Sequence, residues 1–187
     1  MIRRTFLALA IVAPAMAPMG AARAQDMFTL KPIVKAVREG DDEKVRQALL
    51  KGENPNQNDT SGQPLLMVAV MNGQLAVVET LLKGGAAVDA LDRESYTSLL
   101  RAAERGDVDM VEILLRRNAK PNVQNRQGMT PLMVASRLGY AEVVRALLDK
   151  KADPNTADFT GRTALTYARQ SGRTTIEAML RRAGGRE

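Results

Sequence analysis

The chain of 187 residues contains no cysteine, no histidine and no tryptophan, and only 3% of its residues are aromatic. Chemistry that depends on a thiol or an imidazole is therefore excluded, which removes cysteine nucleophiles, Ser-His-Asp triads, Cys/His zinc sites, iron–sulfur clusters and disulfides. An enzyme could still use carboxylate, Lys, Tyr or Ser side chains, or a hard cation bound by oxygen atoms. The length is that of a single domain.

Residues 1–24 have the layout of a secretory signal peptide. Arg3 and Arg4 precede an apolar stretch over residues 6–19, and small residues lead up to Ala24. Two prolines interrupt the stretch, which is also shorter than the roughly 20 apolar residues of a membrane-spanning helix. We therefore expect cleavage after Ala24 and a mature protein that is periplasmic or secreted, as for a bacterial exported protein. The adjacent arginines also resemble a twin-arginine export signal, so the general secretory and twin-arginine routes both stay open.

Cleavage changes the charge balance of the chain. It removes three arginines, so the formal net charge falls from +6 to 6 − 3 = +3. A charge of this size provides no large positive field to hold a phosphate backbone. We therefore expect no nucleic acid as a partner, and no membrane anchor in the mature chain.

The rest of the chain repeats itself every 33 residues without a gap. Three further sets of residues keep the spacing shown by Leu66, Leu99, Leu132 and Leu165: Ala69, Ala102, Ala135 and Ala168; Gly73, Gly106, Gly139 and Gly172; and Leu81, Leu114, Leu147 and Leu180. Periods of 20–50 residues are typical of solenoids. The spacing predicts five units, which are residues 26–58, 59–91, 92–124, 125–157 and 158–187.

Each unit has the pattern of a turn, a helix, a second turn and a second helix. An Asx residue opens the unit and a Gly follows three residues later in most units, and both favour a turn. An apolar run such as Pro131 to Gly139 then predicts a short first helix. Residues 143–148 carry apolar side chains at i, i+1, i+4 and i+5, which predicts a second helix with one apolar stripe. A single unit is too small to bury this stripe, so neighbouring units must stack.

These motifs resemble the ankyrin repeat. Residues 125–132 read Asn-Arg-Gln-Gly-Met-Thr-Pro-Leu, and Ala135, Gly139 and the apolar residues of the second helix follow at the matching places. The resemblance covers nearly all of residues 26–187. It implies an all-α ankyrin-repeat solenoid of paired antiparallel helices with protruding β-turns, with about five repeats including caps. It also implies a protein-interaction module without catalytic activity.

The chain departs from the ankyrin pattern in two ways. The usual His after the Pro-Leu pair is replaced in turn by Met67, Leu100, Met133 and Thr166. We expect apolar packing between units to take the place of that polar bracing. Unit 92–124 has Ser95 where Gly is expected and Ser98 where Pro is expected. Its first turn should therefore be the least regular and the most mobile in hydrogen exchange.

The two ends carry polar side chains where inner units are apolar. Glu177 and Arg181 replace apolar residues in the last unit, and Lys35, Lys44 and Ala48 stand at places that are more apolar in later units. Polar end faces keep a stacked array soluble. We therefore expect a monomer.

Acidic residues gather where the second helices begin, as in Asp41, Asp42 and Glu43 and in Asp107 and Asp109. Such a cluster could form a cation site or an acid–base pair. Carboxylates at a helix start also cap free amides and meet the positive end of the helix dipole, and we favour that interpretation. We therefore expect no metal site and no cofactor.

By the ankyrin resemblance, partner contacts fall on the protruding turns and on the concave side of the first helices. The candidate contact residues there are Arg93, Tyr96, Arg105, Arg126, Met129, Arg137, Leu138, Phe159 and Arg162. Aromatic, Met and Arg side chains are enriched in interface hot spots, and the arginines favour an acidic partner surface. Alternatively, the aromatic rings pack on the adjoining turn and the arginines only solubilise the surface.

The resemblance favours an adaptor or inhibitor that binds another exported protein. Three alternatives stay open: a host-directed effector, as in other bacterial ankyrin proteins; an enzyme or ligand site built from carboxylates with Tyr140 or Tyr167; and reversible oxidation of the methionines. The sequence has no glycine-rich phosphate loop and no paired acids outside helix starts, which argues against an enzyme.

Overall fold

The computed structural model describes residues 31–186, so the expected signal peptide and its cleavage after Ala24 lie outside the described residues. Within this range the elements are short α-helices: α2 (Pro32–Glu39), α3 (Asp42–Leu50), α4 (Leu65–Met71), α5 (Leu75–Lys83), α6 (Ser98–Arg105), α7 (Val108–Arg116), α8 (Pro131–Leu138), α9 (Ala141–Asp149), α10 (Ala164–Gln170) and α11 (Thr174–Arg182). None of these helices has the length and apolar character needed to cross a membrane.

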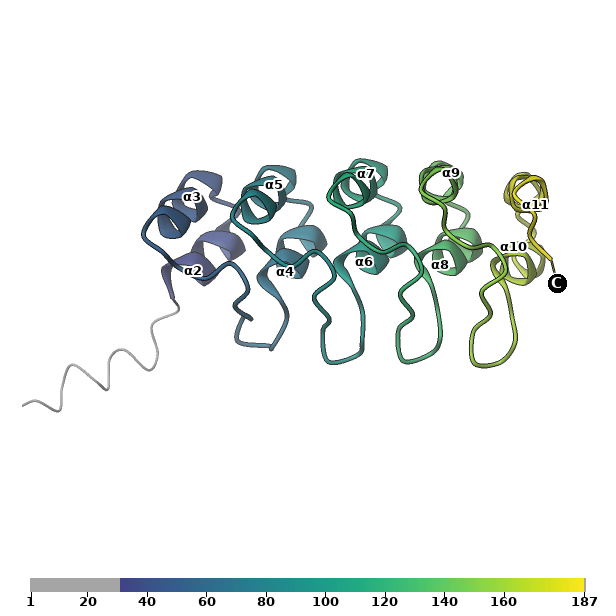
Figure 1. Cartoon of the computed structure of the whole chain (residues 1–187), viewed down its shortest axis with the longest axis horizontal. Coiled ribbons are helices and arrows are strands. Elements are labelled where there is room, and N and C mark those ends of the chain that lie inside the picture. Colours follow the sequence, from purple (N-terminus) through teal and green to yellow (C-terminus); the bar gives the residue numbers. More distant parts are fainter. Residues whose placement is uncertain (1–30, 187) are drawn as a thin grey trace, which may run out of the picture. The chain divides into compact units, whose positions relative to one another are not determined.

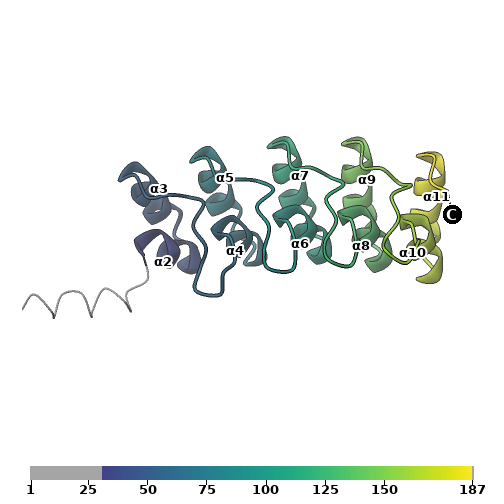
Figure 2. The same cartoon turned by 60° about the horizontal axis from the view of Figure 1, so that its bottom comes forward.

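The helices form two rows, which Figure 1 shows one above the other. The first helix of each unit (α2, α4, α6, α8 and α10) lies in one row, and the second helices lie in the other. Long turns project beyond the row of first helices, and Figure 2 shows the same order from another side. Helices α4, α6, α8 and α10 begin at residues 65, 98, 131 and 164, each 33 residues after the last. The all-α repeat solenoid predicted from the sequence is confirmed.

The repeated apolar residues form the core between units. Leu66, Leu99, Leu132 and Leu165 are each at most 2% exposed, and the four repeated alanines are fully buried. First helices pack on the next first helix along the array, as α6 does on α8 and α8 on α10. A larger side chain in place of these alanines would overpack the contacts between neighbouring units. The stack therefore requires small residues at these positions.

Apolar packing replaces the missing histidines. Met67, Leu100 and Met133 are fully buried. In the last unit, Thr166 keeps a polar brace, because its backbone N–H donates to Thr163 Oγ1 and its Oγ1 accepts from the Thr163 N–H, both at 3.4 Å. The expected exchange of polar for apolar bracing is therefore confirmed in three units. The burial of these methionines also accounts for them as packing groups.

The acids at the starts of the second helices cap them. The side chains of Asp41 and Asp107 accept hydrogen bonds at 3.0 Å from the backbone N–H groups of Lys44 and Met110. The hydrogen bonds from Lys44 lower the pKa of Asp41. Residues 31–186 contain no group of three or more acidic side chains close enough together to hold a metal ion. The capping interpretation is confirmed for both helices.

The turn that opens unit 92–124 is as regular as the others, so the expectation of an irregular turn is wrong. Ser95 has φ 62°, close to the 80° of Gly62 and the 78° of Gly128 in the matching turns. Asp92 Oδ1 accepts from the backbone N–H groups of Glu94 (2.8 Å) and Tyr96 (2.9 Å), and these bonds hold the turn in shape. The extra mobility of this turn stays a prediction for hydrogen exchange.

The ends of the array are polar, with one exception. Lys35 and Lys44 are exposed and form ion pairs with Glu39 at 3.8 and 3.3 Å, and Glu177 pairs with Arg181 at 2.9 Å. Ala48 is only 4% exposed, so it belongs to the packing and not to the polar end face.

Replacing Ser95 with Gly should stabilise the protein by about 1 kcal/mol, because a non-glycine residue with positive φ carries a strain of about that size. Urea denaturation measures the change. Ser61 is the matched control, since it sits in the preceding turn with an ordinary φ, and its change to Gly should give no gain in stability. Equal effects of the two substitutions would contradict the assignment of strain to Ser95.

Candidate functional site

Each projecting turn is built around the side chain of its opening residue. The Oδ1 atoms of Asp59, Asp92, Asn125 and Asp158 each accept two backbone N–H groups, from the residues two and four places later, at 2.8–3.0 Å. Such Asx turns satisfy the backbone locally. The tip residues are therefore presented on a rigid support.

The second carboxylate oxygen of each Asp receives a side-chain donor. Asp92 Oδ2 accepts from Arg101 at 3.0 Å, and Asp158 Oδ2 accepts from the Tyr167 hydroxyl at 2.5 Å. Arg101 and Tyr167 each lie nine residues after the Asp, at the same place in the repeat. A carboxylate at the start of these two turns is therefore matched by a donor on the first helix.

In the turns that open units 59–91 and 125–157, too, no carboxylate oxygen of the opening residue lacks a donor. Asp59 Oδ2 accepts at 3.0 Å from Arg38, which belongs to the preceding unit. In unit 125–157 the donor position holds Val134, and the opening residue is the uncharged Asn125. The amide keeps the two backbone bonds of the turn and leaves no anionic oxygen without a donor.

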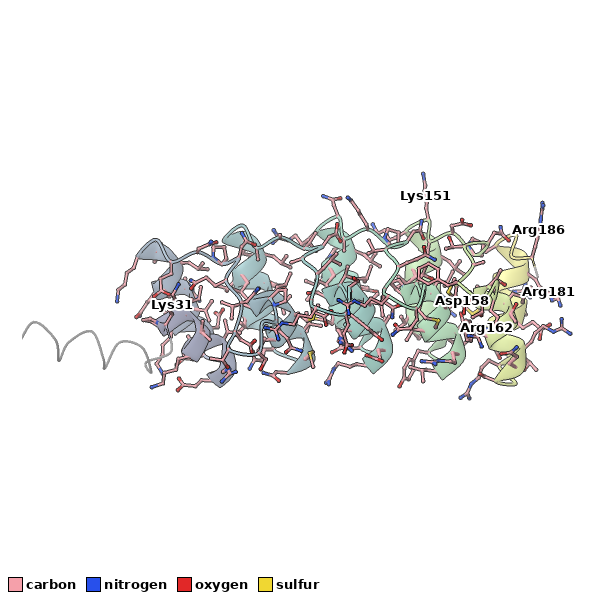
Figure 3. All side chains as sticks on the ribbon, turned by 90° about the horizontal axis from the view of Figure 1, so that it is seen from below. Lys31, Lys151, Asp158, Arg162, Arg181 and Arg186 are labelled. Atoms are coloured by element: carbon pink, nitrogen blue, oxygen red, sulfur yellow. The ribbon has the colours of Figure 1, made fainter. Side chains whose placement is uncertain are left out.

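Asp158 has the most buried of these carboxylates, with a side chain that is 1% exposed. Burial alone would raise its pKa, but the hydrogen bonds from Tyr167, Thr160 and the backbone outweigh burial and hold the pKa of Asp158 far below its usual range. Arg162 adds an ion pair at 3.1 Å, and Figure 3 shows Arg162 beside Asp158. Burial and the bond to Asp158 together raise the pKa of Tyr167.

Arg101 organises a second cluster that sequence reasoning missed. Its guanidinium lies 3.6 Å from the centre of the Tyr96 ring and pairs with Asp92 at 3.0 Å, Glu104 at 3.1 Å and Glu94 at 3.8 Å. The ring of Tyr96 is therefore half-buried and covered on one face. The missed signal was an Arg at a repeat position that holds valine in the two neighbouring units.

Phe159 is both packed and exposed. A Cβ atom on Gly128 would lie 2.7 Å from the Phe159 backbone nitrogen and 2.9 Å from its Cδ1, so only glycine fits under the ring. The side chain still leaves Phe159 72% exposed. The ring therefore rests on the preceding turn, which agrees with the alternative that the aromatic rings pack on the adjoining turn. It also exposes a large apolar face to solvent.

Arg126 and Arg93 occupy the same position at the tip of the turn as Phe159, one and two units earlier. The Arg93 guanidinium lies over Gly62, where a Cβ would come within 2.8 Å of Nε. The Arg126 backbone N–H donates to the Glu94 carbonyl at 3.3 Å. Successive tips thus contact one another, and their outward side chains form one continuous strip.

Four of the predicted contact residues carry a charge without a counter-ion. Arg93, Arg105, Arg126 and Arg137 are exposed and form no ion pair with a carboxylate anywhere in residues 31–186. Arg162, by contrast, is paired with Asp158. Along the second helices, charges are paired within the helix, as the following distances show: Arg46–Asp42 3.0 Å, Lys83–Glu79 3.3 Å, Arg116–Glu112 3.3 Å and Arg145–Glu142 2.9 Å.

Met129 is a correction to the predicted surface. The sequence placed it on the exposed strip, but it is only 7% exposed. The residue four places after the opening Asx turns inward in every described turn, since Gln63, Tyr96 and Arg162 at the same position are all half-buried. Leu138 is half-buried as well. Neither residue is an open contact group.

The two tyrosines considered for catalysis have structural roles. The Tyr167 hydroxyl is bonded to Asp158 and the residue is 5% exposed. The Tyr140 ring lies over Gly106, where a Cβ would come within 2.7 Å of it. Both rings therefore join neighbouring parts of the stack.

The charged network around Asp158 predicts a pH-dependent stability. Because the folded-state pKa of Asp158 is lowered, its contribution is complete above the ordinary pKa of 3.8 and is lost as the pH falls below it. Asp158→Asn should cost about 1.5–3 kcal/mol at neutral pH, and the cost should shrink toward pH 2. Denaturation at several pH values measures it, with the exposed Asp149→Asn as a control of near-zero effect. A cost that does not change with pH would refute the network.

The comparisons with known proteins agree with this architecture. A family model described as "Ankyrin repeats (3 copies)" matches residues 33–125 and, a second time, residues 99–185. A search of curated proteins found no match to the chain. Proteins built from ankyrin repeats are generally protein-interaction modules without catalysis. With the family match extending over most of its length, the chain belongs to the ankyrin repeat family and is a protein–protein interaction module.

Proposed function

We propose that the chain is an exported adaptor or inhibitor without catalytic activity, and that it binds the acidic surface of another exported protein. The observation that carries this proposal is the strip of unpaired arginines, Arg93, Arg105, Arg126 and Arg137, beside the exposed ring of Phe159. The strip lies on the turns and first helices, and Arg93 and Phe159 also contact the turn of the preceding unit.

The chemistry of the strip suits a carboxylate-rich partner. An arginine side chain can donate two parallel hydrogen bonds to one carboxylate, and such bonds are stronger than neutral ones. Opposite charge on the partner also speeds encounter and disfavours wrong partners. The Asx turns keep the tips in place before binding, so little conformational entropy is lost on association.

The proposed location rests on residues 1–24. Their basic start, apolar stretch and small residues before Ala24 follow the order of a secretory signal peptide. A chain without cysteine also has no thiol to oxidise in an oxidising compartment. The partner is therefore sought among exported proteins.

Affinity capture from a periplasmic extract, followed by mass spectrometry, identifies the partner. Phe159→Ala should then weaken its binding by about 30-fold, since truncation of a hot-spot residue costs about 2 kcal/mol or more. Tyr96→Ala should weaken it less, because its ring is partly covered by Arg101. Arg93→Ala with Arg126→Ala should weaken binding and flatten its dependence on salt.

The matched control is Arg116→Ala with Arg145→Ala, which removes the same charge from the second helices. These variants should bind as the wild type does, and circular dichroism should show equal helicity in all of them. If the tip variants bind with unchanged affinity, the strip is not the contact surface.

A further inference from the structure

A groove lies on the side of the array opposite the projecting turns. It runs between the second helices α3 and α5, which Figure 1 shows next to each other in the upper row. Its volume is about 660 Å³, and Leu49, Leu50, Ala76 and Gly84 supply its apolar lining. The matching groove between α7 and α9 measures only about 160 Å³. The groove between α3 and α5 is therefore the larger of these two.

Three positions in this groove lack the charge that most other units carry there. Position by position, Leu50 corresponds to Lys83, Arg116, Asp149 and Arg182; Ala76 corresponds to Glu43, Asp109, Glu142 and the uncharged Thr175; and Gly84 corresponds to Lys51, Arg117, Lys150 and the uncharged Ala183. All three lie in the lining of the one groove. The clustering of Leu50, Ala76 and Gly84 in one groove is independent of the arginine strip.

The side chain of Leu50 lies at the edge of the groove and is mostly exposed to solvent. It is 81% exposed, more than any other large apolar side chain in residues 31–186. Together with Leu49, Ala76 and Gly84 it forms the apolar part of a groove whose other lining residues are polar: Asp42, Arg46, Glu53, Glu79, Thr80 and Lys83.

The charges on the two rims are complementary to each other. Helices α3 and α5 each have nine residues and run in the same direction, so a residue of α3 lies level with the residue 33 places later on α5. Arg46 is level with Glu79, and Leu50 is level with Lys83. At the far end, Glu53 lies on the α3 side and Lys83 on the α5 side. One rim thus carries the opposite charge to the other at the height of Arg46 and Glu79. Within the chain these two groups also form exposed pairs on their own helices, Arg46 with Asp42 and Glu79 with Lys83.

The arrangement of charges on the two rims is complementary to the same surface on a second copy of the chain. If two copies meet face to face about a two-fold axis along the groove, α3 of one copy lies on α5 of the other. Arg46 then faces the partner's Glu79, and Leu50 lies beside the partner's Lys83 and Gly84. A two-fold axis across the groove would instead set Arg46 against Arg46 and Glu79 against Glu79, because both are the fifth residue of their helix.

We infer that the α3–α5 groove is a self-association surface through which two copies form a two-fold symmetric dimer. Only the N-terminal parts of the two arrays overlap in it, and the projecting turns of both copies stay uncovered. The polar end faces still prevent end-to-end stacking, but the proposed dimer departs from the monomer that we expected from the sequence. The contact is small, so the dimer is weak and forms with rising concentration.

Sedimentation of the purified protein from low to high micromolar concentration tests this inference. The wild type should pass from monomer to dimer, and Leu50→Lys should stay monomeric. Lysine is the residue at the same place in α5, so the variant should fold normally. Leu91→Lys is the matched control, since Leu91 is 51% exposed outside the groove, and it should dimerise as the wild type does. A wild type that stays monomeric, or a Leu50→Lys variant that dimerises, would overturn the proposal.

A charge swap tests the arrangement of the two copies. Arg46→Glu alone and Glu79→Arg alone should each weaken the dimer, because each places like charges face to face. The double variant should regain most of the wild-type association, because the two charges are exchanged across the axis. Failure of the double variant to recover, with circular dichroism showing a folded protein, would overturn the proposed two-fold axis. If Leu50→Lys instead abolished binding to a different protein while the wild type stayed monomeric, the groove would belong to that partner and not to a second copy.

Discussion

The burial of apolar side chains between neighbouring units is the interaction on which the rest of the structure depends. A unit of 33 residues cannot enclose its own leucines, whereas Leu66, Leu99 and Leu132 are almost completely buried once the units lie side by side. The replacement of the usual histidines by Met67 and Met133 extends the same principle, since these positions too are filled by fully buried apolar groups. The fold is thus maintained by contacts between neighbours.

Because the core lies between units, the surfaces that face outward are free to differ. On the side of the turns, Asx residues fix the backbone and leave Arg93, Arg126 and Phe159 available to a partner. On the side of the second helices, ion pairs within each helix neutralise most charges, and Leu50 stands out as an apolar exception. One array therefore carries two surfaces of different chemistry, an arginine strip and a groove with leucines between charged rims.

The sequence predicts the elements of this fold well, because a 33-residue period with Asx, Gly and apolar residues at constant places has one simple physical solution. It fails where the outcome depends on neighbours. Ser95 was expected to disturb its turn, but Asp92 holds that turn through two backbone bonds. Met129 was placed outside although its position turns inward. Arg101 was missed because its role arises only from the groups around it, Tyr96 and Asp92.

The most direct measurement is the unfolding free energy of Leu132→Ala. Leu132 is 1% exposed between units, so its truncation leaves a cavity and should cost about 2–5 kcal/mol, with an unchanged dependence of the free energy on denaturant. Leu91→Ala, at a half-exposed leucine outside the stack, should cost far less. A Leu132→Ala variant with the denaturation midpoint of the wild type would contradict the claim that contacts between units hold the protein together.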